Sequence, residues 1–238
     1  ERDNDPMDDL GHGTHCAGII SAQTNNNLGV AGVTWFCKLM NIRAGFRTTA
    51  GGFLEDDDVS SAIIYAADNG AQIISISWGD TELSPVIRDV CQYAFEMGVV
   101  IIASAGNEAG VGLLYPAALD NIISVTAIDE DLSLCSFSSY GEGIDLCAPG
   151  INILSTYLYN DYKKEGGTSM AAPFASGAVA LLLSQNPLLI NEEIYDLLKI
   201  SCDDLGDKGY DNQFGYGIIN IEKLLINSTK SNQIEAEI

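Results

Sequence analysis

The chain has 238 residues, of which 33 are aspartate or glutamate and 11 are lysine or arginine, so its net charge at pH 7 is −22. This charge argues against a nucleic-acid partner, since no basic patch is visible, and it favours cationic substrates. No apolar run reaches the roughly 18 residues of a membrane span, whereas 47% hydrophobic residues suffice for one sizeable core.

The first part of the chain contains both of its histidines, His12 and His15. Residues 1–9 are polar and acidic and predict a surface loop, and a helix is predicted over His12–Ala22 after Gly11. The asparagine-rich segment Gln23–Val30 then predicts a loop. Its amide and carbonyl oxygens suit a hard cation such as calcium, although a plain turn is the alternative.

Apolar and polar segments alternate through the middle of the chain. We expect a buried strand over Cys37–Ile42, a glycine-rich loop over Arg43–Leu54 and a helix over Val59–Asp68, which the acidic Glu55–Asp58 precede as a solvated cap rather than a metal site. Further on we expect strands over Gln72–Ser77, Val99–Ser104 and Asn121–Ala127, with a helix from Pro85 to Met97 capped by Ser84. This alternation predicts an α/β fold, in which a parallel sheet has helices on both faces.

The motif Gly167-Thr168-Ser169-Met170-Ala171-Ala172-Pro173 precedes the most apolar helix, which is predicted over Ala171–Leu183 with Thr168 as its N-cap. Ser169 then lies in the first helical turn, where backbone N–H groups are unpaired and the helix dipole favours negative charge. A serine hydroxyl needs a base to act as a nucleophile, and the chain offers only two histidines for that role.

The remaining segments are less informative about chemistry. A capped amphipathic helix is predicted over Asn191–Ser201, and Gly215-Tyr216-Gly217 is expected to close onto the core, while residues 227–238 predict a polar, frayed tail. The six cysteines form no C-x-x-C pair, which argues against a zinc site. Their apolar surroundings favour buried free thiols, although an even number also permits disulfides.

Two motifs carry a resemblance to a known family. Gly167 to Pro173 and Gly11-His12-Gly13-Thr14-His15-Cys16-Ala17-Gly18 resemble the serine and histidine motifs of the subtilisin-like serine proteases, above all those of the thermitase-like branch, and Ala105-Gly106-Asn107-Glu108 resembles the oxyanion motif. The resemblance implies a three-layer subtilisin-like fold over residues 1–226 and an endopeptidase that works through an acyl-enzyme. Ser169 would be the nucleophile, His12 the general base and Asn107 an oxyanion donor, while His15 would be a core histidine.

The resemblance also implies binding residues. Ser77-Trp78-Gly79 and Ser104-Ala105-Gly106 would form the two walls of the pocket for the residue before the cut, Leu114 would give it a shallow apolar floor, and Gly52 would lie on the edge that pairs with the substrate backbone. The shallow floor favours small or medium apolar residues. A structural calcium ion would bind the Asn26 side chain and the backbone carbonyls of Gln23, Leu28 and Val30.

One member of the family's triad has no counterpart in the chain. The catalytic aspartate precedes the histidine motif by some twenty-five to thirty residues in this family, whereas His12 is close to residue 1. We expect an N-terminally truncated sequence whose aspartate strand lies upstream of residue 1, so that this chain is nearly inactive and its parent active. Substitution by Asp8 or Asp9 is the less favoured reading.

The resemblance carries further expectations about partners and location. We expect polypeptide substrates, a possible N-terminal propeptide, a monomer, and secretion, with a cytoplasmic location as the alternative. The rival function is that of a non-catalytic homologue that serves as a binding or regulatory domain, which the intact His12, Asn107 and Ser169 argue against.

Overall fold

The computed structural model describes residues 5–49, 51–110 and 112–235. At its centre is a parallel sheet of β3 (Ile73–Ile76), β4 (Val100–Ser104), β5 (Ile123–Ile128) and β6 (Leu146–Pro149), which pair in that order. This confirms the α/β class. Every residue of β4 and β5 is buried, because helices cover both faces of the sheet and leave no solvent side.

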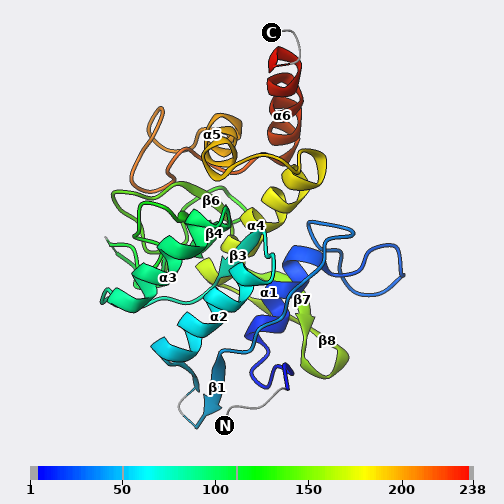
Figure 1. Ribbon diagram of the computed structural model, residues 1–238, viewed down its shortest axis with the longest axis vertical. Coiled ribbons are helices and arrows are strands. Elements are labelled where there is room, and N and C mark those ends of the chain that lie inside the picture. The colour runs from blue at the N-terminus through cyan, green and yellow to red at the C-terminus, as the bar shows by residue number, and fades with distance from the viewer. Residues whose placement is uncertain (1–4, 50, 111, 236–238) are drawn as a thin grey trace.

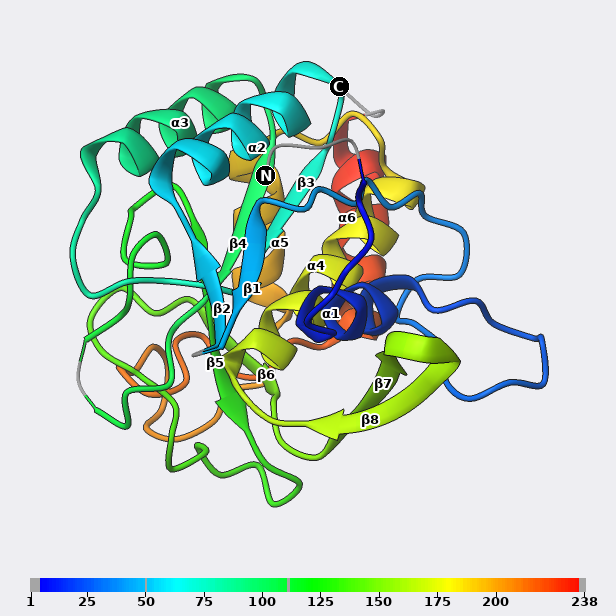
Figure 2. The ribbon, with the colours of Figure 1, turned by 90° about the horizontal axis from the view of Figure 1, so that it is seen from below.

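The residues of β4 alternate between two cores, as a strand periodicity of two requires. Val100 and Ile102 join the larger core, which α4 (Thr168–Gln185), α5 (Asn191–Ser201) and α6 (Ile221–Glu235) complete. Ile101 and Ala103 join the smaller core beneath α2 (Asp56–Asp68) and α3 (Pro85–Glu96). Figure 2 shows these two groups of helices on opposite sides of the sheet.

Helix α1 (His12–Ser21) lies outside this three-layer body, on the side of α4 (Figure 1). An antiparallel hairpin of β7 (Ile153–Tyr157) and β8 (Asp161–Glu165), joined by the short 3-10 turn η1 (Leu158–Asn160), curves around its outer side (Figure 2). This hairpin carried no signal that we recognised in the sequence. It ends two residues before Gly167, so it leads directly to Ser169.

The segment before α2 differs from its prediction. Residues 37–42 form no strand, because no described strand pairs with their backbone, and the side chains of Leu39, Met40 and Ile42 remain about 40% exposed. The expected glycine-rich loop over Arg43–Leu54 instead contains an antiparallel hairpin of β1 (Gly45–Thr48) and β2 (Gly51–Leu54), in which Phe46 and Phe53 stack with ring centroids 6.4 Å apart.

Two further predictions are corrected at helix ends. Thr168 is not the N-cap of α4 but its first residue, after Gly167. The expected frayed tail from residue 227 continues α6 as far as Glu235, where Ser228 is buried and the amide of Asn227 donates to Ser201 Oγ. Packing against α5 therefore extends the helix past the point at which the sequence becomes polar.

All six cysteines are free thiols, as their surroundings predicted. Within the described residues, no helix is both long and apolar enough to cross a bilayer.

Candidate active site

Ser169 is the second residue of α4, and its carbonyl has an unusual set of partners. In a helix this carbonyl would accept from the N–H of the residue four positions later, but that residue is Pro173, which has no N–H. Ser77 Oγ donates to Ser169 O instead, at 2.9 Å, and so does Cys16 Sγ at 3.3 Å. The serine–proline spacing thus lets side chains from α1 and from the residue after β3 hold the backbone of Ser169.

Asn107 follows β4, and its amide group is oriented by Thr168. Asn107 Oδ1 accepts from the backbone N–H of Thr168 at 2.9 Å and from its hydroxyl at 3.1 Å, and Thr168 Oγ1 accepts in turn from Gly106 N. This is why Thr168 is not a cap: its hydroxyl is committed to Asn107. With Oδ1 used as the acceptor, Nδ2 is left as a donor.

The donors of Asn107 and Ser169 border the same space beside Gly167. A Cβ placed on Gly167 would lie 3.4 Å from Asn107 Nδ2 and 3.7 Å from Ser169 N. Glycine at this position therefore keeps open the volume that two N–H donors face. Fixed donors around a space of this kind stabilise an oxyanion better than mobile water does.

His12 is the first residue of α1 and follows Gly11, which adopts a left-handed conformation with φ of 95°. Burial lowers the pKa of His12 below its usual 6.5, whereas the charges of Glu165 and Asp8 oppose the shift. A lowered pKa keeps the imidazole neutral near pH 7, which is the form that accepts a proton. Among the described residues, none forms a hydrogen bond with the His12 ring.

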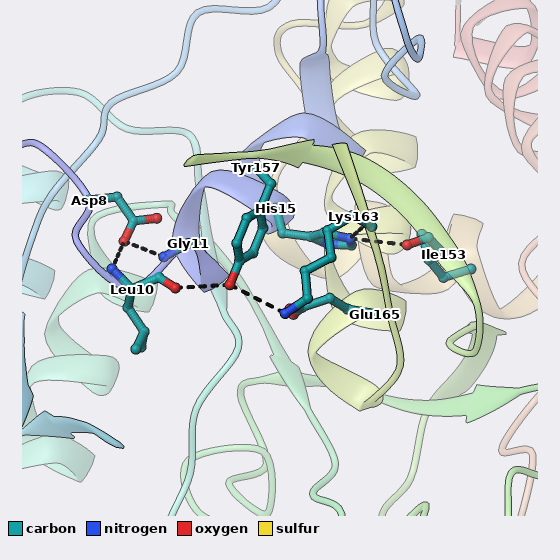
Figure 3. A network of polar contacts seen from close by, with 8 residues as sticks. All are labelled: Asp8, Leu10, Gly11, His15, Ile153, Tyr157, Lys163 and Glu165. Carbon is teal, nitrogen blue, oxygen red and sulfur yellow. Dashed lines mark hydrogen bonds and ion pairs between the residues drawn. The ribbon is translucent and has the colours of Figure 1, made fainter. Parts of the chain in front are cut away.

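Asp8 accepts hydrogen bonds from residues at the start of α1 (Figure 3), and it forms none with the His12 ring. Its carboxylate accepts from the backbone N–H groups of Leu10, Gly11 and Thr14, each at 2.8 Å, and from the Thr14 hydroxyl at 2.7 Å. Burial by itself raises the pKa of Asp8, but these hydrogen bonds outweigh it and hold the pKa below 3.8. Asp8 thus satisfies unpaired N–H groups at the helix start.

The faces of α1 and α4 that carry the candidate base and nucleophile meet. Cys16 lies one turn after His12, and burial raises the pKa of its thiol to about 11, so that it remains protonated and donates to Ser169 O. The Ser169 hydroxyl donates to Ser77 O at 3.2 Å. For proton transfer to His12 this hydroxyl must leave Ser77 O and turn towards the imidazole, as catalytic hydrogen bonds often tighten only when substrate binds.

The predicted pocket walls follow β3 and end β4, and Leu114 lies between them. A Cβ on Gly79 would lie 2.9 Å from Leu114 Cβ, and one on Gly106 would lie 2.6 Å from Leu114 Cγ. Leu114 N donates to Ala105 O at 2.9 Å, which fixes this segment against β4. The structure thus brings four of the predicted pocket residues together, namely Gly79, Ala105, Gly106 and Leu114.

Gly52 lies elsewhere along the site. It is part of β2 and pairs with Arg47, and a Cβ on it would lie 2.6 Å from Leu10 Cδ2. Gly52 therefore lies beside the segment that precedes α1 and not among the pocket residues.

Comparison with known proteins identifies the family. The profile of the subtilase family matches residues 1–217, which is most of the chain. This chain belongs to the subtilase family. Its match to that profile spans the histidine, asparagine and serine motifs.

Named relatives agree with this assignment. The chain is 40% identical over 220 residues to the thermophilic serine proteinase of Bacillus sp. (strain AK1), covering 92% of this chain and 53% of that protein. It is 40% identical over 185 residues to thermitase of Thermoactinomyces vulgaris (78% and 65%), and 41% identical over 211 residues to the halolysin-like extracellular serine protease Nep of Natrialba magadii (89% and 38%). The chain thus spans between about a third and two thirds of the length of these subtilases.

The asparagine-rich loop of this subtilase is shaped by its own side chains. Asn25 and Asn27 adopt left-handed conformations, and Asn26 Oδ1 accepts from Leu28 N at 3.0 Å. Gln23, Asn26, Leu28 and Val30 lie in this one short loop, which offers side-chain and backbone carbonyl oxygens, the ligand type that calcium prefers. Elsewhere in the described residues, Glu55, Asp57 and Asp58 bring carboxylate oxygens within 4.8 Å of one another at the start of α2, where they suit the helix dipole.

Some residues around the site could not be found by motif. Tyr157, Lys163 and Glu165 form a polar network beside Gly11 and Leu10 (Figure 3), and the Glu165 carboxylate accepts from Lys163 Nζ at 2.6 Å. They come from β7 and β8, which the sequence analysis did not predict. The spacing of Ser169 and Pro173 was visible in the sequence and could have indicated that the Ser169 carbonyl needs partners outside its helix.

Proposed function

We propose that this subtilase is a serine endopeptidase, with Ser169 as nucleophile, His12 as general base and Asn107 as oxyanion donor. The observation that supports this most directly is the convergence of Asn107 Nδ2 and Ser169 N on the space beside Gly167. Two N–H donors at the start of a helix, next to a serine hydroxyl, match the needs of acyl transfer.

The reaction would proceed in two halves. Ser169 Oγ attacks the scissile carbonyl carbon while His12 takes its proton, and the carbonyl oxygen becomes an oxyanion that accepts from Asn107 and from Ser169 N. Collapse breaks the peptide C–N bond, and His12 returns the proton to the leaving amine. Water then attacks the acyl-enzyme, again with His12 as base, and releases the acid and free Ser169. The expectation that an aspartate upstream of residue 1 orients His12 stays a prediction.

Labelling with a fluorophosphonate, which reacts covalently with activated serines, tests this function. The protein is expressed from its whole native coding sequence as wild type, Ser169→Ala and Ser176→Ala. Ser176 is a matched control, because it is a buried serine of the same helix whose hydroxyl bonds to Ser75 and Ala172. We expect the wild type and Ser176→Ala to label and Ser169→Ala to lose the label. A folded wild type that never labels would favour the rival, a non-catalytic binding domain.

We infer that the residue before the cleaved bond is small or medium and apolar. The Leu114 side chain lies against both Gly79 and Gly106, so it would present apolar surface between the proposed pocket walls and limit their depth. The wall residue Trp78 packs against the smaller core, which adds apolar surface to this region. The substrates would be polypeptides that present such a residue in an extended segment.

We further propose a structural calcium ion in the loop of Gln23, Asn26, Leu28 and Val30. An ion that binds only the folded protein raises its stability, so a chelator should lower the melting temperature and added calcium should restore it. Replacement of Asn26 by alanine should weaken this response. An equal response to calcium in Asn26→Ala would place the ion elsewhere.

The remaining proposals concern the protein in its setting. We propose secretion, in line with the printed names of the halolysin-like extracellular serine protease and the minor extracellular protease Epr of Bacillus subtilis (strain 168). We also propose that the protease works as a monomer and that an N-terminal propeptide of its own accompanies it. Sedimentation of the purified native product, together with sequencing of its mature N-terminus, tests both points.

A further inference from the structure

One face of helix α1, together with the preceding Gly11, packs closely against the β7–β8 hairpin. Gly11, His15 and Gly18 are spaced four and three residues apart, so they lie on one face of the helix. A Cβ on Gly11 would lie 2.4 Å from the Tyr157 ring, and one on Gly18 would lie 2.1 Å from Thr156 Oγ1. The two glycines therefore let β7 approach the helix more closely than any side chain would permit.

Between these glycines, the ring of His15 bridges both strands of the hairpin (Figure 3). His15 Nε2 lies 3.0 Å from Ile153 O in β7 and 3.0 Å from Lys163 O in β8. Both partners are acceptors, so Nε2 carries the hydrogen and shares it between them. The side chain is fully buried, and no described residue bonds to Nδ1.

Hydroxyl groups of β7 complete this set of contacts between α1 and the β7–β8 hairpin, which we call the clamp. Ser155 Oγ donates to His15 O at 2.8 Å, and Thr156 Oγ1 donates to Thr14 O at 2.9 Å. The hairpin and the helix thus exchange hydrogen bonds in both directions across a close contact. Few apolar side chains lie here, since the separate cluster of α1 contains only Cys16, Ile19 and Met170 as buried members, with Ile153 packed against it.

The clamp joins the two parts of the active site. On one side, His15 belongs to the first turn of the helix that begins with His12. On the other side, Lys163 lies six residues before Ser169, and β8 runs through Glu165 into the Gly166–Gly167 turn. A shift of β8 relative to α1 would therefore move the nucleophile and the oxyanion space relative to the base.

Resting on the function proposed above, we propose that His15 is a positioning residue, which sets the distance and orientation of Ser169 relative to His12 by binding both strands of the hairpin that leads to Ser169. It touches neither the substrate nor the reacting atoms. The pocket walls after β3 and in β4 do not contact this hairpin through any described hydrogen bond, so substrate binding should depend little on His15.

Three variants of the native product test this role. His15→Phe keeps a ring of similar shape but removes the donor, whereas His15→Gln keeps an N–H donor at a similar reach. Thr34→Val is the matched control, because Thr34 is buried and its hydroxyl donates to Ile20 O at the opposite end of α1, away from the hairpin. The measurements are kcat and KM on a peptide substrate, the rate of fluorophosphonate labelling, and amide hydrogen exchange in β7 and β8.

We expect His15→Phe to lower kcat and the labelling rate about 100-fold with KM unchanged, since a misplacement of about 1 Å costs this much. Exchange in β7 and β8 should accelerate about tenfold, as expected for the loss of one buried hydrogen bond. His15→Gln should recover most of the activity, and Thr34→Val should keep wild-type kcat.

The outcomes separate this proposal from the proposed function. If His15→Phe keeps wild-type kcat, or if Thr34→Val loses as much kcat as His15→Phe, then His15 serves stability alone and the proposal is wrong. If the folded wild type neither labels nor cleaves, the proposed function and this role for His15 both fall. The exchange data would then still report whether the hairpin is clamped.

Discussion

Ser169 lies in α4 and Asn107 follows β4, two elements whose side chains fill the main cores, whereas His12 begins a helix with a small separate cluster. Twelve residues of α4 are buried, from Thr168 to Leu183, against four residues of α1. The part of the site that contains Ser169 and Asn107, here called the serine side, is thus held by apolar packing against a sheet that helices cover on both faces. The part that contains His12, here called the histidine side, is held by polar contacts, namely the hydrogen bonds of Asp8, of His15 and of the β7 hydroxyls.

The two sides of the site meet different physical requirements. The oxyanion donors must be fixed, because they work by being preorganised, and close packing supplies that rigidity. Helix α1 has few buried apolar contacts, so its local opening should require less free energy than opening of α4. Substitutions on the serine side should therefore change the chemical step, and those on the histidine side should also change stability and dynamics.

The largest effect below is expected on the serine side, at Asn107. Asn107→Asp keeps the oxygen that Thr168 binds but replaces the Nδ2 donor by a negative oxygen that faces the oxyanion. We expect kcat to fall about 10²–10³-fold with KM little changed, as for the loss of one oxyanion donor. Steady-state kinetics check this, and an unchanged melting temperature would show that the core is intact. A rise in KM with an unchanged kcat would contradict the role of Asn107.

A smaller effect is expected at the pocket between the two walls. Leu114→Gly should open the space between Gly79 and Gly106 and admit larger residues before the cut. We expect the ratio of kcat/KM for a phenylalanine substrate over an alanine substrate to rise about 10- to 100-fold, in line with the selectivity of hydrophobic pockets. Paired peptide substrates that differ only at this residue measure the ratio. An unchanged ratio would show that Leu114 does not limit the pocket.

The smallest effects are expected on the histidine side, at Asp8. Asp8→Ala removes the cap of α1 and should lower the free energy of unfolding by about 1 kcal/mol. The pKa of Asp8 is lowered in the folded protein, so this contribution is complete above pH 3.8 and is lost as the pH falls through the lower folded pKa. Chemical denaturation at several pH values measures it, with Asp9→Ala as a neighbouring control.

The same variant tests the electrostatic influence of Asp8 on His12. Neutral His12 is the active base, so kcat/KM should rise with pH through the pKa of His12, which burial places below 6.5. The negative charge of Asp8 raises that pKa, so Asp8→Ala should move the acid limb of the pH profile to lower pH. A shift to higher pH would contradict the electrostatic role of Asp8. Amide exchange should also accelerate in α1 more than in α4.

Motifs and periodicity determined a large part of this protein without its tertiary structure. The β/α alternation gave the parallel sheet with covered faces, since buried strands read as continuous apolar runs and surface helices as amphipathic ones. His12, Asn107 and Ser169 were assigned by short motifs whose glycines and small residues have local causes, namely tight turns and close backbone approach. The family resemblance predicted Leu114 at the floor of the pocket, and the structure places its side chain against Gly79 and Gly106.

Only the tertiary structure decided the features that depend on distant partners. Residues 37–42 have the composition of a strand, but a strand also needs a neighbour for its backbone hydrogen bonds, and none of the described strands supplies one. Thr168 has the side chain of a cap, yet its hydroxyl is taken by Asn107, 61 residues away. His15 is the buried core histidine that was predicted, but its two acceptors lie 138 and 148 residues further along the chain, so local pattern could not show what it binds. Local pattern fixes what a residue can bind, and the packing of remote segments decides which partner it meets.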